Sequence, residues 1–326
     1  MEISNIDVLD QRIIQALYGD PRAPFSRLAE IVGSSEQTVS RRYRRLLDDR
    51  IVRVVGQLDT QRVGQSDWAV RIRCAPGSAP TVADKLAEHP DTSWVQLTSG
   101  GTEIFSLVRS RDGEQQTPNL LGQLSVGRHV VGLEAYCLLH LFGTAFSAAT
   151  GPSNHSPSEI TQLLSPTPDS PSIDRPKAKL QDSDRQLIQA LADDGRASYR
   201  QLATRTHWHE TTVRRRVEEL TASGILFFDL DVAGDAFGVR SQALLWMSVA
   251  PAKLTAVGQA LASRPEFPFV AATSGSTNLV AALVCPNDRS LFEYLTDEMS
   301  AFNGITHIET APVMQFVKMH AAMTRR

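Results

Sequence analysis

The sequence has few cysteines and no long hydrophobic run. Only three of its 326 residues are cysteine, Cys74, Cys137 and Cys285, and they lie far apart. An odd, scattered set argues against a disulfide framework or a zinc site and fits a reducing cytoplasm, which is the location we expect. No run of about 18 apolar residues occurs, so the sequence predicts no membrane-spanning helix. The first residues are acidic and lack the apolar segment of a signal peptide.

An excess of positive charge is also absent. The chain carries 33 lysines and arginines against 36 acidic residues, a formal net charge of −3. This balance excludes a protein that is basic over its whole surface, so any nucleic-acid binding must come from local patches. Neither a Walker phosphate loop nor a Rossmann glycine fingerprint occurs. We therefore predict no catalytic residue, no metal site and no cofactor.

Arginines are concentrated in residues 34–53, S-S-E-Q-T-V-S-R-R-Y-R-R-L-L-D-D-R-I-V-R. On a helix, one side of this segment is apolar and predicts a core face: Val39, Tyr43, Leu46 and Leu47. The opposite side is polar and basic: Gln37, Thr38, Arg41, Arg44 and Arg45. A periodic segment, Phe25–Val32, precedes it and ends at Gly33, and Ile6–Leu17 is also helical in period. This pattern predicts a helix-turn-helix whose second helix enters the major groove; the alternative is a solvated charged face.

The following residues change to short apolar stretches. Ile51–Leu58 predicts a wing or hinge strand. Residues 68–74, 93–97, 103–108 and 129–141 predict strands, and 80–89 and 120–126 predict helices, which gives the order βαββαβ. The antiparallel sheet of such a unit carries helices on one face only, so we expect its other face to pair with a second such sheet. Residues rich in Ser, Pro, Thr and Asp then predict a linker at 146–178.

The whole pattern then repeats. Asp184–Leu191 matches Asp10–Leu17, and Glu210-x-Thr-Val-x-Arg-Arg matches Glu36-x-Thr-Val-x-Arg-Arg, at an offset of 174 residues. In the second part the offset is 175, with Glu309 on Glu134. The chain is therefore a tandem duplication of a two-domain module. We expect winged helix-turn-helix domains at 1–63 and 179–237, a linker at 146–178, and ferredoxin-like βαββαβ domains at 64–145 and 238–326, an α+β protein.

The module resembles the Lrp/AsnC (feast/famine) family of transcription regulators. The opening Leu9-Asp10-x-x-Ile-Ile-x-x-Leu, the Gly-Arg-Ala of Gly195–Ala197, the Thr-Ser-Gly turns and the strand Gly304–Thr310 carry this resemblance. It implies RAM-type ligand-sensing domains and a cytoplasmic, sequence-specific regulator that binds double-stranded DNA, senses an amino-acid-like effector and self-associates into dimers or higher oligomers. Because one chain holds two modules, it can fold as a pseudo-dimer by itself.

We assign DNA contacts from the helical positions. Base edges are assigned to Gln37, Thr38 and Arg41 and, in the second copy, to Thr211, Thr212 and Arg215. Phosphates or flanking positions are assigned to Ser35, Ser40, Arg42, Arg44, Arg45, Arg214 and Arg216. Arg44 and Arg45 of the first copy become Glu218 and Glu219 in the second. We therefore predict that the first copy binds DNA more strongly.

The resemblance places the effector between the sensing domains, near two glycine-containing turns. These turns comprise Thr98, Ser99, Gly100, Gly101, Thr102 and Glu103, and Thr273, Ser274, Gly275, Ser276, Thr277 and Asn278. Glycine lets backbone N–H groups approach a carboxylate closely. Glu103 could pair with an amino group, whereas Asn278 supplies no charge. Ordinary hairpin turns are the alternative interpretation.

Two other functions fit the same architecture. Sirohaem decarboxylases resemble this module and are sometimes fused in pairs. That family carries a His-Cys-Tyr-x-Arg-like stretch in the sensing domain, where this sequence has Trp94-Val-Gln-Leu-Thr-Ser and Phe269-Val-Ala-Ala-Thr-Ser. The second alternative is a ligand-binding protein that no longer binds DNA. We expect a regulator rather than an enzyme because the arginine helix would have no purpose in a decarboxylase.

Overall fold

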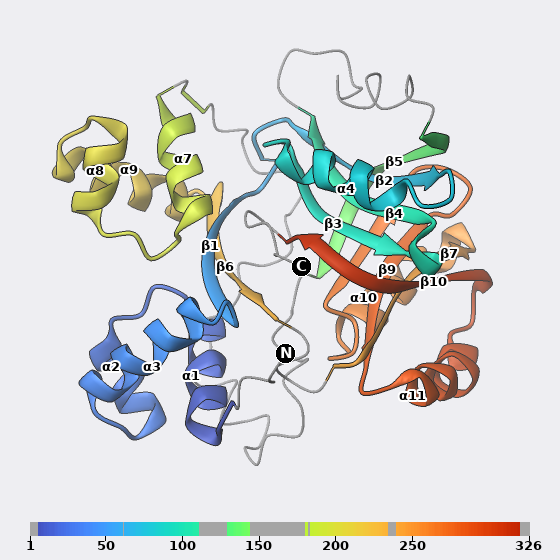
Figure 1. Cartoon of the computed structure of the whole chain (residues 1–326), viewed down its shortest axis with the longest axis horizontal. Coiled ribbons are helices and arrows are strands. Elements are labelled where there is room, and N and C mark those ends of the chain that lie inside the picture. The colour runs from blue at the N-terminus through green and yellow to red at the C-terminus, as the bar shows by residue number, and fades with distance from the viewer. Residues whose placement is uncertain are drawn as a thin grey trace. The chain divides into compact units, whose positions relative to one another are not determined.

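The computed structural model describes residues 6–60, 62–110, 129–143, 180–181, 183–233 and 239–319. The chain divides into two compact units, one from Met1–Val63 and Thr150–Phe237 and the other from Gly64–Ala149 and Gly238–Arg326 (Figure 1). The predicted helix at 120–126 and the predicted linker at 146–178 lie outside the described residues. Within the described ranges, no helix is long and apolar enough to cross a membrane.

The first unit contains two three-helix bundles, one from each copy. Their helices are α1 (Val8–Gly19), α2 (Phe25–Val32), α3 (Glu36–Asp48), α7 (Asp184–Asp193), α8 (Tyr199–Thr206) and α9 (Glu210–Ala222). Gly33 ends α2 in the left-handed region, with φ of 69°, and the Ser35 hydroxyl caps α3 by accepting from the Thr38 N–H. Val39, Tyr43 and Leu46 are buried as predicted, but Leu47 is exposed. The predicted helix-turn-helix is confirmed in both copies.

One strand from each copy joins the two bundles. β1 (Val52–Leu58) pairs antiparallel with β6 (Leu226–Val232) along its whole length, with Val55 opposite Asp229. The N–H of Gly195, which follows α7, donates to the Val54 carbonyl at 2.8 Å. In the described residues, the predicted wing or hinge strand therefore serves as the link between copies, and the paired strands run between the bundles (Figure 1).

Two arginines reinforce this link reciprocally. Arg22 donates to the Ala197 carbonyl at 3.2 Å, and Arg196 donates to the carbonyls of Pro21 and Ala23 at 2.6 and 2.7 Å. Each guanidinium also lies over an aromatic ring of the other copy, Arg22 over Tyr199 and Arg196 over Phe25. Burial lowers the pKa of both arginines. Arg22-Ala23 and Arg196-Ala197, which match each other in the repeat, therefore hold the two bundles together.

The second unit contains the two sensing copies. The first copy has β2 (Ser66–Cys74), α4 (Ala79–Glu88), β3 (Thr92–Thr98), β4 (Glu103–Ser110) and β5 (Val130–Gly143). The second has β7 (Ser241–Val249), α10 (Leu254–Ala262), β8 (Phe269–Thr273), β9 (Leu279–Cys285), α11 (Asp288–Glu293) and β10 (Ile305–Lys318). The complete βαββαβ order is visible in the second copy and confirms the predicted α+β class.

The two sheets join into a closed barrel with the strand order β10-β3-β4-β2-β5-β8-β9-β7. The long last strand of each copy makes the junctions, because β5 pairs with β2 of its own copy and β8 of the other. β10 likewise pairs with β7 and with β3. Inside, Phe105 and Trp246 stack edge to face at 6.0 Å between ring centroids. The open face of each sheet is thus covered by the other sheet, as predicted.

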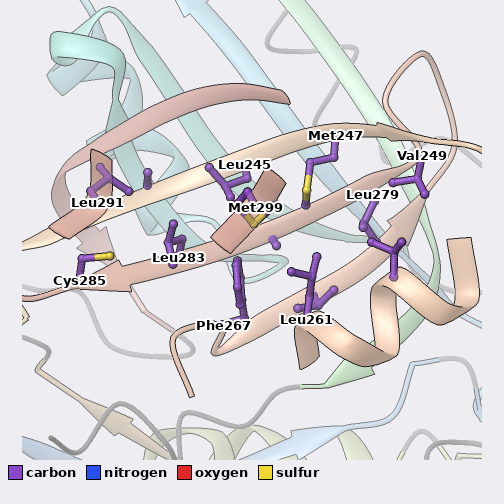
Figure 2. Packing of buried hydrophobic residues seen from close by; sticks show 14 residues of the cluster. Leu245, Met247, Val249, Leu261, Phe267, Leu279, Leu283, Cys285, Leu291 and Met299 are labelled. Carbon is purple, nitrogen blue, oxygen red and sulfur yellow. The ribbon is translucent and has the colours of Figure 1, made fainter. Parts of the chain in front are cut away.

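Helices cover the outer faces of the sheets. In the second copy, Leu261 of α10 and Phe267 pack against Leu245, Met247 and Leu279 of the strands (Figure 2). β9 is buried at every position because alternate residues face this outer core and the inner one shared with the first copy. This double burial explains its unbroken apolar sequence, Leu-Val-Ala-Ala-Leu-Val-Cys.

The close approach of the two copies predicts that Gly195→Ala destabilises the first unit. A Cβ there would lie 2.8 Å from Val54 Cγ1 and 3.0 Å from the Val54 backbone. Overpacking of this kind costs about 1–3 kcal/mol. Urea denaturation measures the loss. Gly132→Ala is the control, because its Cβ would meet only the flexible end of Arg73; equal effects of the two substitutions would contradict the close packing.

Candidate nucleic-acid interface and effector turns

The outward side of α3 carries the residues predicted to contact DNA. Gln37, Arg41 and Arg44 are exposed, whereas Thr38 and Ser40 are half-buried. In the described part of the chain, neither Arg41 nor Arg44 has an ion-pair or hydrogen-bond partner within the protein. Their guanidinium groups are therefore available to an external anion.

Two other arginines of α3 bind a buried carboxylate. Asp10 of α1 is 0% exposed and pairs with both Arg42 and Arg45, with 3.1 Å from Arg42 Nη1 to Asp10 Oδ1. Arg42 also pairs with Asp7, and its hydrogen bonds to the two aspartates raise its pKa. The structure thus gives Arg42 an internal partner where we assigned it a phosphate, so that it fixes α3 on α1.

A hollow of about 170 Å³ lies beside this ion-pair cluster, lined by Asp7, Arg41, Arg42 and Arg45. The Arg45 side chain remains 46% exposed despite its pair with Asp10. Three arginines, Arg41 among them, and one aspartate therefore line this space. Such a concave cationic surface suits an oxyanion such as a backbone phosphate.

The second helix, α9, has the same framework but a different surface. Arg216 makes two hydrogen bonds to the buried Asp184, at 2.8 and 2.6 Å, which raise its pKa. Arg216 therefore has the internal role of Arg42. Thr211, Thr212, Arg214 and Arg215 are exposed. The helix begins after His209, whose side chain makes no capping hydrogen bond.

Each arginine of α9 also has a glutamate partner on the same helix. Arg214 lies 3.8 Å from Glu210, and Glu219 lies 3.5 Å from Arg215 and 3.0 Å from Arg216. By sequence, α9 contains three arginines and three glutamates, a formal charge of zero, whereas α3 contains four arginines, one glutamate and one aspartate, a formal charge of +2. The helices α3 and α9 are therefore electrostatically different.

The first predicted effector turn is tied to a charged cluster. Glu103 is only 6% exposed and accepts from the Ser99 hydroxyl at 2.8 Å. Arg71 of β2 donates to Glu103 at 2.9 Å and to Glu309 of β10 at 2.8 Å, so it joins the two copies. The hydrogen bond from Arg71 lowers the pKa of Glu309. Gly100 turns the chain with φ of 70°, between Thr98 and Thr102.

The second turn, 273–278, lacks these charges. Trp246 stands at the position of Arg71 and Asn278 at that of Glu103. Both ends of the Asn278 amide bond the Val249 backbone, at 2.8 and 2.7 Å. Ser274 is bonded to the backbone of Cys137 in β5, and a Cβ on Gly275 would lie 2.6 Å from the Tyr136 ring. The contacts with Cys137 and Tyr136 therefore hold the second turn against β5 of the first copy.

Sequence reasoning found the exposed arginines but missed their internal partners. Asp10 and Asp184 occupy matched places in the repeat, as do Arg42 and Arg216. The presence of an aspartate and an arginine at these places in both copies was the signal in the sequence that they pair. No sequence pattern could have predicted the ion pair of Arg71 with Glu309, because the two residues belong to different copies. Among the described residues, no three His, Cys, Asp or Glu side chains form a group suited to a metal ion.

Comparisons with known proteins match both parts of the module. A model of the AsnC-type helix-turn-helix domain matches residues 6–47 and 180–221, and a model of the Lrp/AsnC ligand-binding domain matches 242–323. The transcriptional regulator AldR of Mycolicibacterium smegmatis is 29% identical over 147 residues, covering 43% of this chain and 86% of AldR. The regulator FL11 of Pyrococcus furiosus is 27% identical over 140 residues, covering 43% of this chain and 92% of FL11.

Solved structures of a siroheme decarboxylase resemble nearly the whole chain. The siroheme decarboxylase NirDL, in complex with an iron-uroporphyrin III analogue, superposes with a TM-score of 0.64 and covers 96% of this chain and 94% of its own. The sequence identity is 13%, so the likeness establishes the fold. Each of these regulators thus matches 43% of this chain by sequence, and the decarboxylase matches 96% of it by fold.

Proposed function

Because this chain is a tandem-duplicated member of the Lrp/AsnC family, we propose that it is a transcriptional regulator that binds DNA sequence-specifically and responds to a small-molecule effector. The observation that carries the DNA-binding part is the pair of exposed, unpaired guanidinium groups of Arg41 and Arg44 on the outward side of α3. Burying the apolar side of α3 while leaving these groups in solvent suits a helix that meets a polyanion.

The residues of α3 divide into three roles. Gln37, Thr38 and Arg41 near the helix start contact base edges, since a long amide and a guanidinium can each make two hydrogen bonds to a purine. Arg44 and Arg45 bind phosphates of the DNA backbone, and Ser35 and Ser40 lie at flanking positions. Arg42 holds the helix on the buried Asp10 and so sets the angle at which it enters the groove.

Arg41→Ala and Arg44→Ala are expected to weaken DNA binding in different ways. The first removes a base contact, which costs about 1–3 kcal/mol and relaxes specificity. The second removes a phosphate contact and reduces the salt slope of binding by about 0.9. Fluorescence anisotropy of the full chain with chromosomal fragments, at several salt concentrations, measures both. Arg289→Ala on α11, 87% exposed, is the control; binding unchanged in all three variants would contradict the assignment.

An effector with the charges of an amino acid fits the first turn. Arg71 holds two carboxylates, Glu103 and Glu309, so a zwitterion can insert without leaving a buried charge unpaired. Its carboxylate replaces that of Glu309 on Arg71, near the backbone of Gly100 and Gly101, and its ammonium group pairs with the released glutamate. Because Arg71 and Glu309 belong to different copies, this exchange changes a contact that joins the copies.

The second turn offers no such exchange. Trp246 replaces the arginine that would bind the carboxylate of the zwitterion, Asn278 replaces Glu103, and the Asn278 amide already bonds the Val249 backbone. Of the two predicted effector turns, the first therefore binds the amino acid, and the chain takes one effector rather than two.

The expected stoichiometry is one amino acid per chain, and Arg71→Met is expected to abolish binding. Isothermal titration with a panel of amino acids measures both quantities. Arg289→Met is the control, since Arg289 lies on α11, is 87% exposed and pairs with Glu293 of the same helix. Two effectors per chain, or unchanged affinity in the Arg71 variant, would refute this site.

A second candidate function is that of a sirohaem-decarboxylase-like enzyme, favoured by the fold likeness to NirDL over the whole chain. When the full chain is titrated with sirohaem, we expect the Soret band of the tetrapyrrole to stay unshifted, because a DNA-binding regulator would not bind sirohaem. A saturable Soret shift together with absent DNA binding would favour the enzyme. Effector binding without DNA binding would instead identify a ligand-binding protein that has lost its operator.

A further inference from the structure

We infer that sequence reading is confined to α3 and that α9 serves as a non-reading partner, so that each chain recognises a single base sequence instead of two related ones. This inference rests on the proposed DNA binding and concerns the kind of duplex that the protein selects. It follows from differences between two helices that share one framework and one origin.

The framework is the same in both copies. Asp10 and Asp184 are both 0% exposed, and each binds the arginine at the equivalent position of its reading helix, Arg42 or Arg216. Val39, Tyr43 and Leu46 are matched by the buried Val213, Val217 and Leu220. The two helices are therefore held in their bundles alike, and the difference between them lies on the outward surface.

The outward charges of α9 oppose contact with a duplex. Glu218 and Glu219 replace Arg44 and Arg45, and both are exposed. The pairs that Glu219 makes with Arg215 and Arg216 are partly solvated and individually weak. Breaking them would still leave the carboxylate among the phosphates, where it repels the backbone. α9 therefore lacks the net attraction that brings α3 close enough to touch base edges.

The start of α9 is also less suited to reading bases. Thr211 stands where α3 has Gln37, and one hydroxyl cannot make the paired hydrogen bonds of an amide to adenine. Ser35 caps α3 with its hydroxyl, whereas the side chain of His209 leaves α9 uncapped. His207 takes the left-handed conformation of Gly33, with φ of 58°, which costs about 1–2 kcal/mol in a non-glycine residue.

The second bundle nevertheless has a physical reason to persist. Its strand β6 forms the two-stranded sheet with β1, and Arg196 donates hydrogen bonds to the carbonyls of Pro21 and Ala23 in the first bundle. Val63 of the first copy packs into the core of the second bundle. Losing the second bundle would expose these surfaces, so it is retained as a support for the copy that reads.

The test is selection of binding sites from a random duplex library with the full chain and two matched variants. Gln37→Ala and Thr211→Ala change exposed residues at equivalent positions, so folding is preserved and checked by thermal melting. We expect the parent and Thr211→Ala to select the same motif, and Gln37→Ala to lose preference at one or more of its positions. A changed motif with Thr211→Ala would overturn the inference.

A gain of contacts provides the second arm. Glu218→Arg combined with Glu219→Arg restores the charges of α3 to α9, and we expect affinity for random duplex at low salt to rise at least tenfold. No rise would overturn the electrostatic argument. If the parent chain enriches no sequence and binds no duplex at low salt, the proposed DNA-binding function itself fails, an outcome distinct from a motif that both helices share.

Discussion

Backbone pairing between the two copies of the module is the constraint on which the rest of the structure depends. β1 and β6 pair in the first unit, and β5 and β10 each extend from their own sheet into the sheet of the other copy. A strand edge left without its partner would expose a row of unpaired N–H and C=O groups. Each copy therefore completes the other, and because both lie on one chain, their pairing does not depend on protein concentration.

Fusion of the copies also permits differences that a homodimer does not. In a symmetric dimer every substitution occurs twice, at both ends of an isologous contact. The Arg71 guanidinium lies 6.0 Å from the centre of the Trp246 ring, which occupies the equivalent position of the other copy. Two arginines there would repel each other, whereas arginine over an aromatic ring is favourable. The asymmetry of the sensing unit thus relieves a conflict that symmetry would impose.

Much of the fold could be predicted from the sequence because duplication supplied two versions of each pattern. The helical period of α3, the Gly33 turn and the alternation in β2 are local signals, and they led to the correct elements. Leu47 was misplaced because its helical position is close to the core face yet its side chain is exposed. The pairing of β1 with β6 could not be derived, since the same strand pattern suits a wing within one copy.

From the sequence, the exposure of single residues of the candidate site could be predicted, but their partners within the protein could not. Exposure of Arg41 and Arg44 follows from a helical wheel, but the burial of Asp10 does not, because an aspartate at the start of a helix usually faces solvent. The internal pairing of Arg42 and Arg45 therefore came from the structure. Likewise Glu103 was a candidate for an amino group, and only the three-dimensional structure shows that Arg71 already neutralises it.

The comparison of the two copies carries more functional information than either copy alone. Residues that stay the same, such as Asp10 with Asp184 and Arg42 with Arg216, maintain the bundle. Several residues that differ lie on surfaces that an external molecule could reach: Arg44 and Arg45 become Glu218 and Glu219, and Glu103 of the first glycine turn becomes Asn278. The shared aspartate–arginine pairs keep α3 and α9 in place, whereas these substitutions change the charge that each copy presents. This contrast agrees with a regulator in which one copy binds and the other supports it.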